Sequence, residues 1–332
     1  MKIRKNILLF EYTTWKIGGP AEYLMETNNS KELVEAISYG KKENLPITIL
    51  GGGSNVLVGD RGIKGLVIIN NSRNWQVLEQ EKKTEKKEEK IIPRQVQLEE
   101  KIRFEDLYYQ ENNREKIKIR AESGVNLTWL IKELLNVGIT GIHWFAGIPG
   151  TVGGAVYNNI HTGHLFLGNY VSAVEVLGDK GKTKRLSLEE CRFDYDCSRF
   201  HDSKEVILSV DFELSLGDRQ KAKKFIEIWL GQRKIKYPLP SAGCVFKNLD
   251  SKTQERLGLP TPSWGYIIDK VLGLKGKKVG GAQISNTHSA FIVNKERATA
   301  KDVLALIDLV KKESNKKIGI GPELEIFLLG DF

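Results

Sequence analysis

The spacing of hydrophobic and polar positions changes several times along the first seventy residues. Ser30–Leu45 carries apolar residues at helical spacing, and its first residue is a serine that can cap a helix. The short apolar run "PITIL" stops at Gly51, and a second such run covers Gly65–Asn70. This part of the chain therefore predicts strands combined with one amphipathic helix.

The rest of the chain predicts three more amphipathic helices and several strands. The helices are expected at Asn126–Val137, Asp218–Lys236 and Thr299–Lys317, with Thr299 as the N-cap of the last. Strands are expected in "AVEVLG", "EVILSVDFELSL" and "GPELEIFLL". Strands and helices alternate without a strict βαβα period, so the pattern favours an α+β or multidomain α/β fold over a barrel.

One segment breaks this pattern. From about residue 77 to residue 118 the chain changes character, and Glu79–Lys90 is almost entirely charged. Such a segment cannot bury apolar surface, so we expect an insertion that is mobile, or a solvated hairpin tip or helix.

The composition excludes several classes of protein. The chain has 332 residues, of which 40% are hydrophobic, so more than one domain is expected. No apolar run approaches the roughly 18 residues of a membrane span, and "ILLF" near the N-terminus is too short for a signal peptide. The net charge is +9, but lysines mostly alternate with glutamates, which favours a phosphate-bearing small substrate over nucleic acid.

The three cysteines are Cys191, Cys197 and Cys244, and they cannot all pair within one chain. None forms a C-x-x-C motif, and the five histidines show no metal-ligand spacing with them. Reduced thiols in a cytoplasmic protein without a bound metal are therefore expected.

Two glycine-rich loops follow predicted strands, and such loops let a ligand approach the backbone closely. The residues singled out are Gly51, Gly52, Gly53, Ser54 and Asn55 in the first loop and Gly147, Ile148, Pro149, Gly150, Thr151, Gly153 and Gly154 in the second. Neither loop matches the G-x-G-x-x-G or Walker pattern. Either alone could be a tight turn, but successive N–H groups can bind an anion, and two such loops favour a dinucleotide or diphosphate ligand.

The stretch "LPSAGCVFKNL" presents Cys244 directly after a turn of small residues. From the residues alone, this cysteine could be a small buried apolar residue, a redox thiol or an acid placed to give up a proton.

Seven motifs occur along the chain in a fixed order. They are "TTWKIGGPAEYL", "ILGGGSNVLVGDRGIKGLVI", "AGIPGTVGGAVYNN", "PSAGCVFKN", "GYIIDKVLGLKGKKVGGAQISNTHSAFIVN", "ATAKDVLALIDLVKK" and "GPELEIF". Together they resemble the UDP-N-acetylenolpyruvoylglucosamine reductase (MurB) family over most of the chain outside about residues 72–118. The short interval between "FDYDCSRF" and "PSAGC" resembles the second subclass of that family.

The resemblance implies an α+β fold with a vanillyl-alcohol-oxidase-type FAD-binding domain in two α/β subdomains and a C-terminal α+β substrate-binding domain. The implied bounds are 1–71 together with the strand in 318–332, then 72–216, and 217–317 for the substrate domain. The implied enzyme is a UDP-N-acetylmuramate dehydrogenase of peptidoglycan synthesis, in which NADPH reduces FAD and the flavin N5 passes hydride to a UDP-sugar enolpyruvyl ether. A cytoplasmic monomer that binds neither nucleic acid nor membrane is expected.

Two acids follow from the resemblance. The family donates a proton from a serine in "SAGS", and here that position is Cys244, whose thiol is a far stronger acid than a hydroxyl. The family's carboxylic acid in "PE" falls on Glu323. Glu325 would point to the same face of a regular strand and could be confused with it.

The family's third catalytic group is an arginine in a "YR-x-S-x-F" pattern, and this chain departs from it. In "YDCSRF" the residue at that position is Asp196, which cannot stabilise an enolate while ionised. We expect Arg199 to supply the charge, with Arg192 or a loss of the role as alternatives.

For the UDP-sugar, the resemblance points to Lys236, Asn248 and His288, and Tyr195 would line the pocket for nicotinamide and substrate. The segment "NNIHTGHLFLGN" also departs from the family's usual "MNAGAYG", so the roles of His161 and His164 stay open. Two other functions compete with the reductase: another flavin oxidoreductase of the same superfamily, and a non-catalytic protein that binds FAD or a UDP-sugar.

Overall fold

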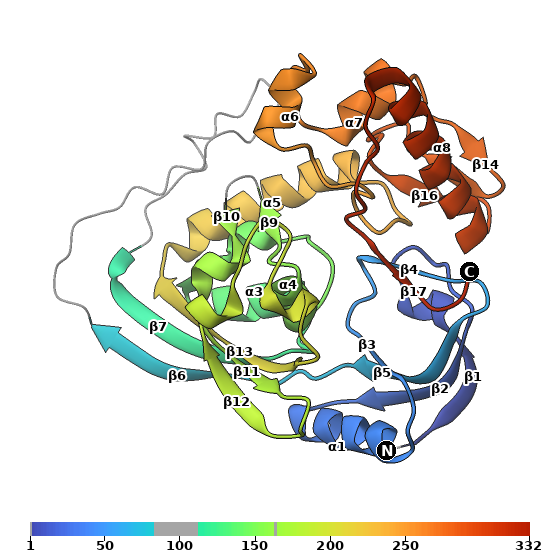
Figure 1. The fold of residues 1–332 in the computed structure, drawn as a ribbon. Coiled ribbons are helices and arrows are strands. Elements are labelled where there is room, and N and C mark those ends of the chain that lie inside the picture. The colour runs from blue at the N-terminus through green and yellow to red at the C-terminus, as the bar shows by residue number, and fades with distance from the viewer. Residues whose placement is uncertain (1, 83–111, 163–164) are drawn as a thin grey trace. The chain divides into compact units, whose positions relative to one another are not determined.

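The computed structural model describes residues 2–82, 112–162 and 165–332 (Figure 1). The chain forms two compact units, one made of residues 26–42 and 69–232 and the other of residues 2–25, 43–68 and 233–332. In the described part of the chain, no helix combines the length and the apolarity needed to cross a membrane.

An antiparallel sheet lies at the centre of the first unit. Its strands follow the order β12-β11-β13-β7-β6, and the short strand β8 also pairs with β13. The strands are β6 (Trp75–Lys82), β7 (Asn112–Glu122), β8 (Ile139–Thr140), β11 (Val171–Leu177), β12 (Thr183–Ser187) and β13 (Val206–Leu216). Most residues of β13 are buried, because this strand has neighbours on both sides and other elements above it.

Helices and short turns cover one face of this sheet (Figure 1). The helices of the unit are α1 (Ser30–Lys42), α3 (Leu127–Asn136), α4 (Val152–Tyr157) and the start of α5 (Arg219–Lys236). The unit also contains 3-10 turns at Ile142–Phe145, Leu167–Tyr170, Glu189–Cys191 and Arg199–His201. Strand β9 (His161–Thr162) pairs with β10 (Leu165–Phe166). Helix α3 begins where the Asn126 side chain accepts a hydrogen bond from the backbone of Trp129. Its leucines and Ile131 pack into the core, as the spacing predicts.

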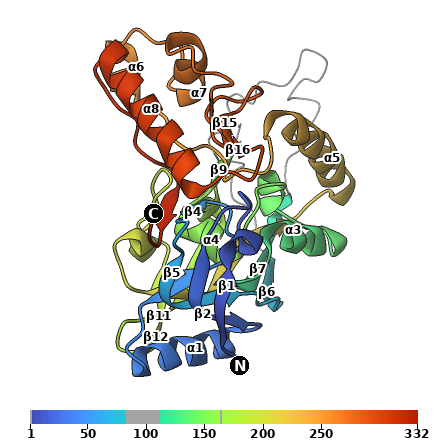
Figure 2. The ribbon, with the colours of Figure 1, turned by 90° about the vertical axis from the view of Figure 1, so that its right-hand side faces the viewer.

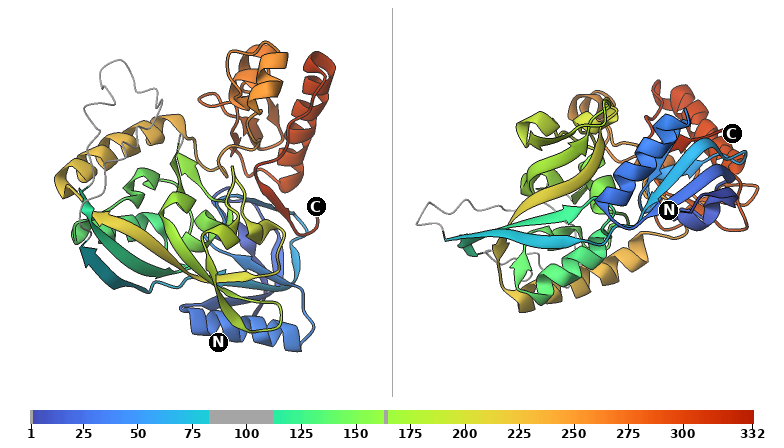
Figure 3. Two further views of the ribbon diagram at one scale, coloured as in Figure 1. Left: turned by 60° about the vertical axis from the view of Figure 1, so that its left-hand side comes forward. Right: turned by 90° about the horizontal axis from the view of Figure 1, so that it is seen from below.

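Both ends of the charged segment predicted from about residue 77 to residue 118 form strands. Strands β6 and β7 pair within it and lie side by side (Figure 3), and Lys118 and Glu79 form an ion pair of 3.2 Å across them. Charged side chains fit one face of a strand while Ile117 and Ile119 on the other face pack into the core. The rest of the segment, residues 83–111, lies outside the described residues.

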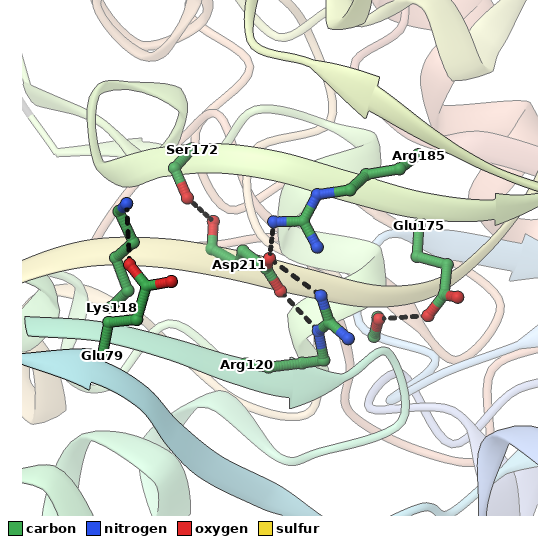
Figure 4. A network of polar contacts seen from close by, with 8 residues as sticks. Glu79, Lys118, Arg120, Ser172, Glu175, Arg185 and Asp211 are labelled. Atoms are coloured by element: carbon green, nitrogen blue, oxygen red, sulfur yellow. Dashed lines mark hydrogen bonds and ion pairs between the residues drawn. The ribbon is translucent and has the colours of Figure 1, made fainter.

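A buried carboxylate ties the strands of this sheet together (Figure 4). Asp211 on β13 accepts hydrogen bonds from Arg120 on β7, at 2.7 Å from Nε and 3.0 Å from Nη2, and it also pairs with Arg185 on β12. The Asp211 side chain is only 3% exposed, and its hydrogen bonds to Arg120 raise the pKa of that guanidinium. Glu175 accepts a further bond from Ser209 at 2.9 Å. The network therefore neutralises a carboxylate that would otherwise be buried alone.

The second unit contains two sheets and a short parallel strand pair. The first sheet has the order β1-β2-β5-β3, the second β14-β15-β16, and β17 pairs with β4. The strands are β1 (Arg4–Leu8), β2 (Pro20–Thr27), β3 (Ile47–Leu50), β4 (Val56–Val58), β5 (Ile63–Asn70), β14 (Lys278–Val279), β15 (Ala282–Ile284), β16 (Ile292–Asn294) and β17 (Phe327–Leu329). Strand β17, near the C-terminus, pairs in parallel with β4, so that Phe327 lies opposite Val56.

Helix α8 (Ala300–Ile318) packs against β14 and β15 (Figure 2). Thr299 accepts a hydrogen bond from the backbone N–H of Asp302 at 3.1 Å, and Asp302 accepts one from the N–H of Thr299 at 3.0 Å. This capping box confirms the predicted N-cap. The unit also contains α6 (Ser251–Arg256), α7 (Trp264–Tyr266), a π-helical turn at Ile267–Val271 and a 3-10 turn at Leu9–Tyr12.

A histidine lies inside the core of the first unit. His143 is 1% exposed, packs edge-on against Phe225, and accepts a hydrogen bond at Nδ1 from the backbone N–H of Gly141 at 3.1 Å. Burial lowers the pKa of this imidazole to about 3, so it is neutral in the folded protein at neutral pH.

His143 should make the protein less stable in acid. An unfolded histidine has a pKa of about 6.5, so between pH 6.5 and about 3 the unfolded state binds a proton that the folded state does not. Stability therefore falls as pH falls through this window. His143→Asn should make the loss in unfolding free energy between pH 7 and pH 4 smaller by about 3 kcal/mol. Urea denaturation at the two pH values measures this, and an unchanged pH dependence would contradict it.

Candidate active site

The turn that carries Cys244 is fixed by hydrogen bonds within the second unit. Ser241 donates from its hydroxyl to the carbonyl of Pro238 at 2.6 Å, and its own carbonyl accepts a bond from the Thr14 hydroxyl at 2.8 Å. Gly243 has φ +81°, a conformation that favours glycine. The turn leaves Cys244 partly exposed, so the thiol is neither a fully buried apolar residue nor an open surface group.

The segment after Cys244 pairs with the segment that carries the predicted carboxylic acid. The Lys247 N–H donates to the carbonyl of Glu323 at 3.0 Å, and the Glu325 N–H donates to the carbonyl of Val245 at 2.9 Å. This isolated antiparallel bridge between Phe246 and Leu324 places the segments that carry the two predicted acids side by side, with Glu323 opposite Lys247. The Glu323 side chain is exposed, whereas Glu325 is half-buried.

A stack of side chains lies in the same unit at the end of helix α5. The Arg233 guanidinium carbon is 5.1 Å from the centre of the Tyr237 ring, which lies 6.0 Å from His288 and nearly parallel to it. His288 in turn contacts Phe291 at 4.8 Å and accepts a hydrogen bond at Nδ1 from Ala290 N–H at 3.3 Å. The predicted substrate residue His288 is thus held by the backbone on one side and by aromatic rings on the other.

Electrostatic coupling links this stack to the thiol. Tyr237 keeps 38% of its surface exposed, yet burial of the rest raises the pKa of its phenol; Arg233 opposes that shift and a charged Cys244 adds to it. Burial lowers the pKa of Arg233. The sequence analysis missed Arg233 and Tyr237. Their spacing of four residues at the end of a predicted basic helix is the signal that could have found them.

The other predicted substrate residues fall in different places. Asn248 is exposed and follows the paired segment. Lys236 is the last residue of α5, and its side chain lies outside the described part of the chain. Tyr195 belongs to the first unit, and His164 lies outside the described residues.

The first glycine loop connects β3 to β4 in the second unit. At Gly53, with φ +58°, an added Cβ would come within 2.1 Å of the Tyr12 carbonyl oxygen, so only glycine fits. Asn55 donates from its side chain to the carbonyl of Glu325 at 3.1 Å, and its own carbonyl accepts a bond from Phe327 at 3.0 Å. The loop is therefore hydrogen-bonded to Glu325 and to the first residue of β17, in the segment that follows Glu323.

The second glycine loop leads into α4 in the first unit. Thr151 caps this helix by accepting a bond from Gly154 N–H at 3.3 Å, and Gly153 N–H donates to the carbonyl of Ser123 at 2.7 Å. An added Cβ on Gly153 would come within 2.7 Å of the Ser123 side chain, whereas one on exposed Gly154 would meet only Thr151. Gly53 and Gly153 are thus buried against neighbouring parts of the protein, whereas Gly52 and Gly154 are exposed, and the exposed backbone of each loop fits the close approach of a dinucleotide such as FAD.

A tight turn in the first unit carries Tyr195 and Asp196. Asp194 and Cys197 exchange backbone hydrogen bonds of 3.0 and 3.2 Å, so the two residues between them form the tip of the turn. Asp196 has φ +46°, which aspartate tolerates better than most residues. Its carboxylate lies 3.5 Å from Nε2 of His161, and the Tyr195 ring lies 5.0 Å from the same imidazole.

Arg199, the predicted replacement for the family arginine, already has an acidic partner. Its Nε lies 2.9 Å from Glu205, its Nη2 donates to the same carboxylate at 3.2 Å, and its Nη1 donates to the carbonyl of Glu190 at 3.0 Å. The Glu205 side chain is only 9% exposed and also pairs with Lys184. The alternative, Arg192, is exposed. The assignment of the enolate-stabilising charge to Arg199, with Arg192 as the alternative, stays a prediction.

Two family models match the chain. Residues 102–187 match an FAD-binding domain, and residues 233–329 match the C-terminal domain of UDP-N-acetylenolpyruvoylglucosamine reductase. The match to the FAD-binding domain contains the second glycine loop. The match to the reductase domain contains Cys244, Glu323 and the stack around Tyr237. They confirm the predicted α+β fold class with an FAD-binding domain followed by a substrate domain, and FAD as the cofactor.

Curated relatives and a solved structure agree with these matches over nearly the whole chain. UDP-N-acetylenolpyruvoylglucosamine reductase of Clostridium novyi is 33% identical over 99% of this chain and 93% of the relative, and that of Chlamydia felis is 34% identical over 98% and 94%. The crystal structure of the Thermus caldophilus enzyme superposes with a TM-score of 0.71 and 29% identity, and covers 99% of both chains. The chain therefore belongs to the UDP-N-acetylenolpyruvoylglucosamine reductase family of oxidoreductases.

Proposed function

We propose that this protein reduces UDP-N-acetylglucosamine enolpyruvate to UDP-N-acetylmuramate with electrons from NADPH, as a cytoplasmic enzyme of peptidoglycan synthesis. The observation that carries the proposal is the pairing of the Cys244 segment with the Glu323 segment inside the matched reductase domain. A thiol and a carboxyl group on adjacent segments suit a reaction that ends in a proton transfer.

The residues proposed to hold FAD are those of the two glycine loops. When bound, FAD supplies the hydride chemistry, accepting hydride from NADPH and delivering it to the enolpyruvyl methylene. The exposed backbone at Gly52 and Gly154 supports this assignment. The protein's own task at these loops is to bind and orient the cofactor.

The two acids act on the other carbon of the enolpyruvyl group. Hydride addition to the methylene leaves negative charge on the adjacent carbon and on the carboxylate, and that enolate needs a donor or a cation beside it. We assign Glu323 to stabilise the enolate and Cys244 to donate the proton that completes the reduction. Arg199 is the sequence-based assignment for the positive charge, although Glu205 already pairs with it.

Substrate binding is assigned to four residues. Lys236 is proposed to contact the diphosphate as a compact cation, with Asn248 and His288 on the same unit, and Tyr195 to line the pocket from the turn that carries it. The stack supports His288 in this role, because the Tyr237 ring, which also contacts Arg233, lies nearly parallel to the imidazole and restricts its orientation.

A non-catalytic protein that binds FAD or a UDP-sugar is the second candidate, and the aspartate at position 196 is the observation that favours it. A steady-state assay separates the two functions. The reductase should consume NADPH only when the enolpyruvyl substrate is present, and the product should have the mass of UDP-N-acetylmuramate. Flavin binding without substrate-dependent NADPH consumption would support the second candidate.

The flavin should be bound without a covalent link. Neither glycine loop contains a histidine or cysteine that could attach it, and the residues that face the ligand there are mostly glycines. Precipitating the purified protein with acid should therefore leave all of the flavin in the supernatant. Flavin that stays with the protein pellet would show a covalent bond and contradict the assignment.

A further inference from the structure

One residue of the second unit, Thr14, is hydrogen-bonded both to the first glycine loop and to the turn that carries Cys244. Its hydroxyl donates to the carbonyl of Ser241 at 2.8 Å, and Ser241 lies three residues before Cys244. Its backbone N–H donates to the carbonyl of Gly53 at 3.0 Å. All four residues belong to the second unit. Thr14 therefore joins the loop proposed to bind FAD to the turn of the proposed proton donor.

The two bonds use different groups of Thr14. A hydroxyl carries one hydrogen, and the Ser241 carbonyl takes it, because the Gly53 carbonyl lies farther from the hydroxyl oxygen, at 3.4 Å. The backbone N–H bonds Gly53 instead. The side chain thus holds the turn and the main chain holds the glycine loop. A substitution at position 14 can therefore remove the first bond and leave the second.

The chain on either side of this contact is fixed. Trp15 is fully buried and belongs to the same core cluster as Ala242, which follows Ser241 in the turn. The carbonyl of Trp15 accepts a bond from the Asn294 side chain at 3.1 Å, and the Asn294 N–H donates to the carbonyl of Pro240 at 3.0 Å. The Thr14 hydroxyl therefore has a defined position from which to hold the turn.

The proposed reaction needs the cofactor and the thiol in fixed relative positions. Hydride is added to the methylene carbon of the enolpyruvyl group, and the proton from Cys244 is added to the adjacent carbon. These carbons are one bond apart, so the groups that act on them must be held to within about 0.5 Å. Cys244 lies on a partly exposed turn, where packing constrains the backbone less than in the core, so hydrogen bonds have to supply that precision.

We propose that Thr14 is a positioning residue that sets the place of the Cys244 turn relative to the first glycine loop, and with it the place of the proton donor relative to bound FAD. Thr14 touches neither substrate nor reacting atoms, and its hydroxyl acts through the carbonyl of Ser241. The inference rests on the proposed reductase function and gives a role to a residue that the sequence analysis did not single out.

The first test follows single turnovers of the NADPH-reduced holoenzyme after mixing with UDP-N-acetylglucosamine enolpyruvate. Thr14→Val keeps the branched shape and the backbone N–H and removes the hydroxyl, so flavin content and reduction by NADPH should stay near those of the wild type. Reoxidation of the flavin should slow by roughly 10–10²-fold, because misplacing a reacting group by about 1 Å can cost that much. Thr14→Ser restores the hydroxyl and should restore the rate. Thr14→Ala should behave like Thr14→Val and replaces it if the valine variant does not fold.

The neighbouring threonine provides the matched control. In the described part of the chain, the bonds of the Thr13 hydroxyl stay within residues 10–17, and the shortest of them runs to the carbonyl of Ile17 at 2.9 Å. Thr13→Val therefore loses a buried hydrogen bond of the same segment but none to the loop or the turn. It should lower the free energy of unfolding and leave reoxidation at the wild-type rate.

A second readout needs no turnover. Iodoacetamide should label the partly exposed Cys244 in the holoenzyme without substrate, and mass spectrometry of the peptide that contains Cys244 separates this reaction from labelling at Cys191 and Cys197. Thr14→Val should be labelled severalfold faster than the wild type, because the turn has lost one of its bonds. Thr14→Ser and Thr13→Val should be labelled at the wild-type rate.

The proposal is overturned if Thr14→Val matches the wild type in reoxidation or in labelling, if Thr14→Ser is as slow as Thr14→Val, or if Thr13→Val slows reoxidation equally. A wild-type enzyme that NADPH reduces but that the substrate does not reoxidise would instead overturn the proposed function.

Discussion

Replacing Cys244 with alanine should stop substrate reduction and leave the earlier steps intact. The variant should still bind FAD and still be reduced by NADPH, because neither step uses the thiol. It should then reduce the enolpyruvyl substrate roughly 10²–10⁴ times more slowly, the usual contribution of a general acid. Stopped-flow measurement of the two half-reactions separates these steps. The reason is the position of Cys244 on a fixed, partly exposed turn whose following segment is bridged to the segment of Glu323.

The serine variant distinguishes the role of Cys244 as proton donor from its alternative roles as a redox thiol or a packing residue. Cys244→Ser should recover much of the lost rate, because a hydroxyl is the donor in the rest of the family, and it should resist peroxide and alkylating agents better than the thiol. A redox thiol would lose its function in both variants. If Cys244→Ala turns over like the wild type and is only slightly less stable, the cysteine is a packing residue and the mechanism is wrong.

Asp211→Ala should destabilise the first unit by about 3–5 kcal/mol, the typical cost of removing one partner from a buried ion pair. Two arginines converge on this carboxylate, and without it the partly buried Arg120 would lose the carboxylate that it bonds and keep only its electrostatic interaction with Glu175 (Figure 4). Urea denaturation of the wild type and the variant, with the flavin present at equal concentration, measures the difference.

A variant that removes all three charges serves as the matched control. Asp211→Leu combined with Arg120→Met and Arg185→Met replaces these three charged side chains with apolar ones, and Glu175 keeps its hydrogen bond from Ser209. The triple variant should lower the free energy of unfolding clearly less than Asp211→Ala does, because buried ion pairs can often be exchanged for apolar groups with little loss of stability. A triple variant as unstable as the single one would show that the loss comes from packing and not from an unpaired charge.

The helices could be predicted from the sequence because their signals are local. The capping box of Thr299 and Asp302 and the apolar stripe of α3 each lie within a few neighbouring residues. The pairing of β6 with β7 was harder to predict. Its residues are largely charged, and a strand with one solvated face resembles a charged loop until its partner strand is known.

Contacts between segments that are far apart in the sequence could not be predicted from the spacing of residues along the chain. The Asp211 network depends on the register of β13 with β7, and the approach of His161 to Asp196 depends on how two hairpins pack on α4. Cys244 and Glu323 were found because the family motifs name them, whereas the fact that their strands pair comes only from the structure. Sequence identifies residue types that suit the chemistry, and the fold decides which of them meet.

Single-turnover reoxidation of the flavin tests the central claim most directly. The purified holoenzyme is reduced by NADPH without oxygen, and UDP-N-acetylglucosamine enolpyruvate is then added while the flavin absorbance is recorded. The reductase function predicts that the oxidised flavin spectrum returns and that one molecule of UDP-N-acetylmuramate forms per flavin. A flavin that NADPH reduces but that stays reduced in the presence of this substrate would contradict the account.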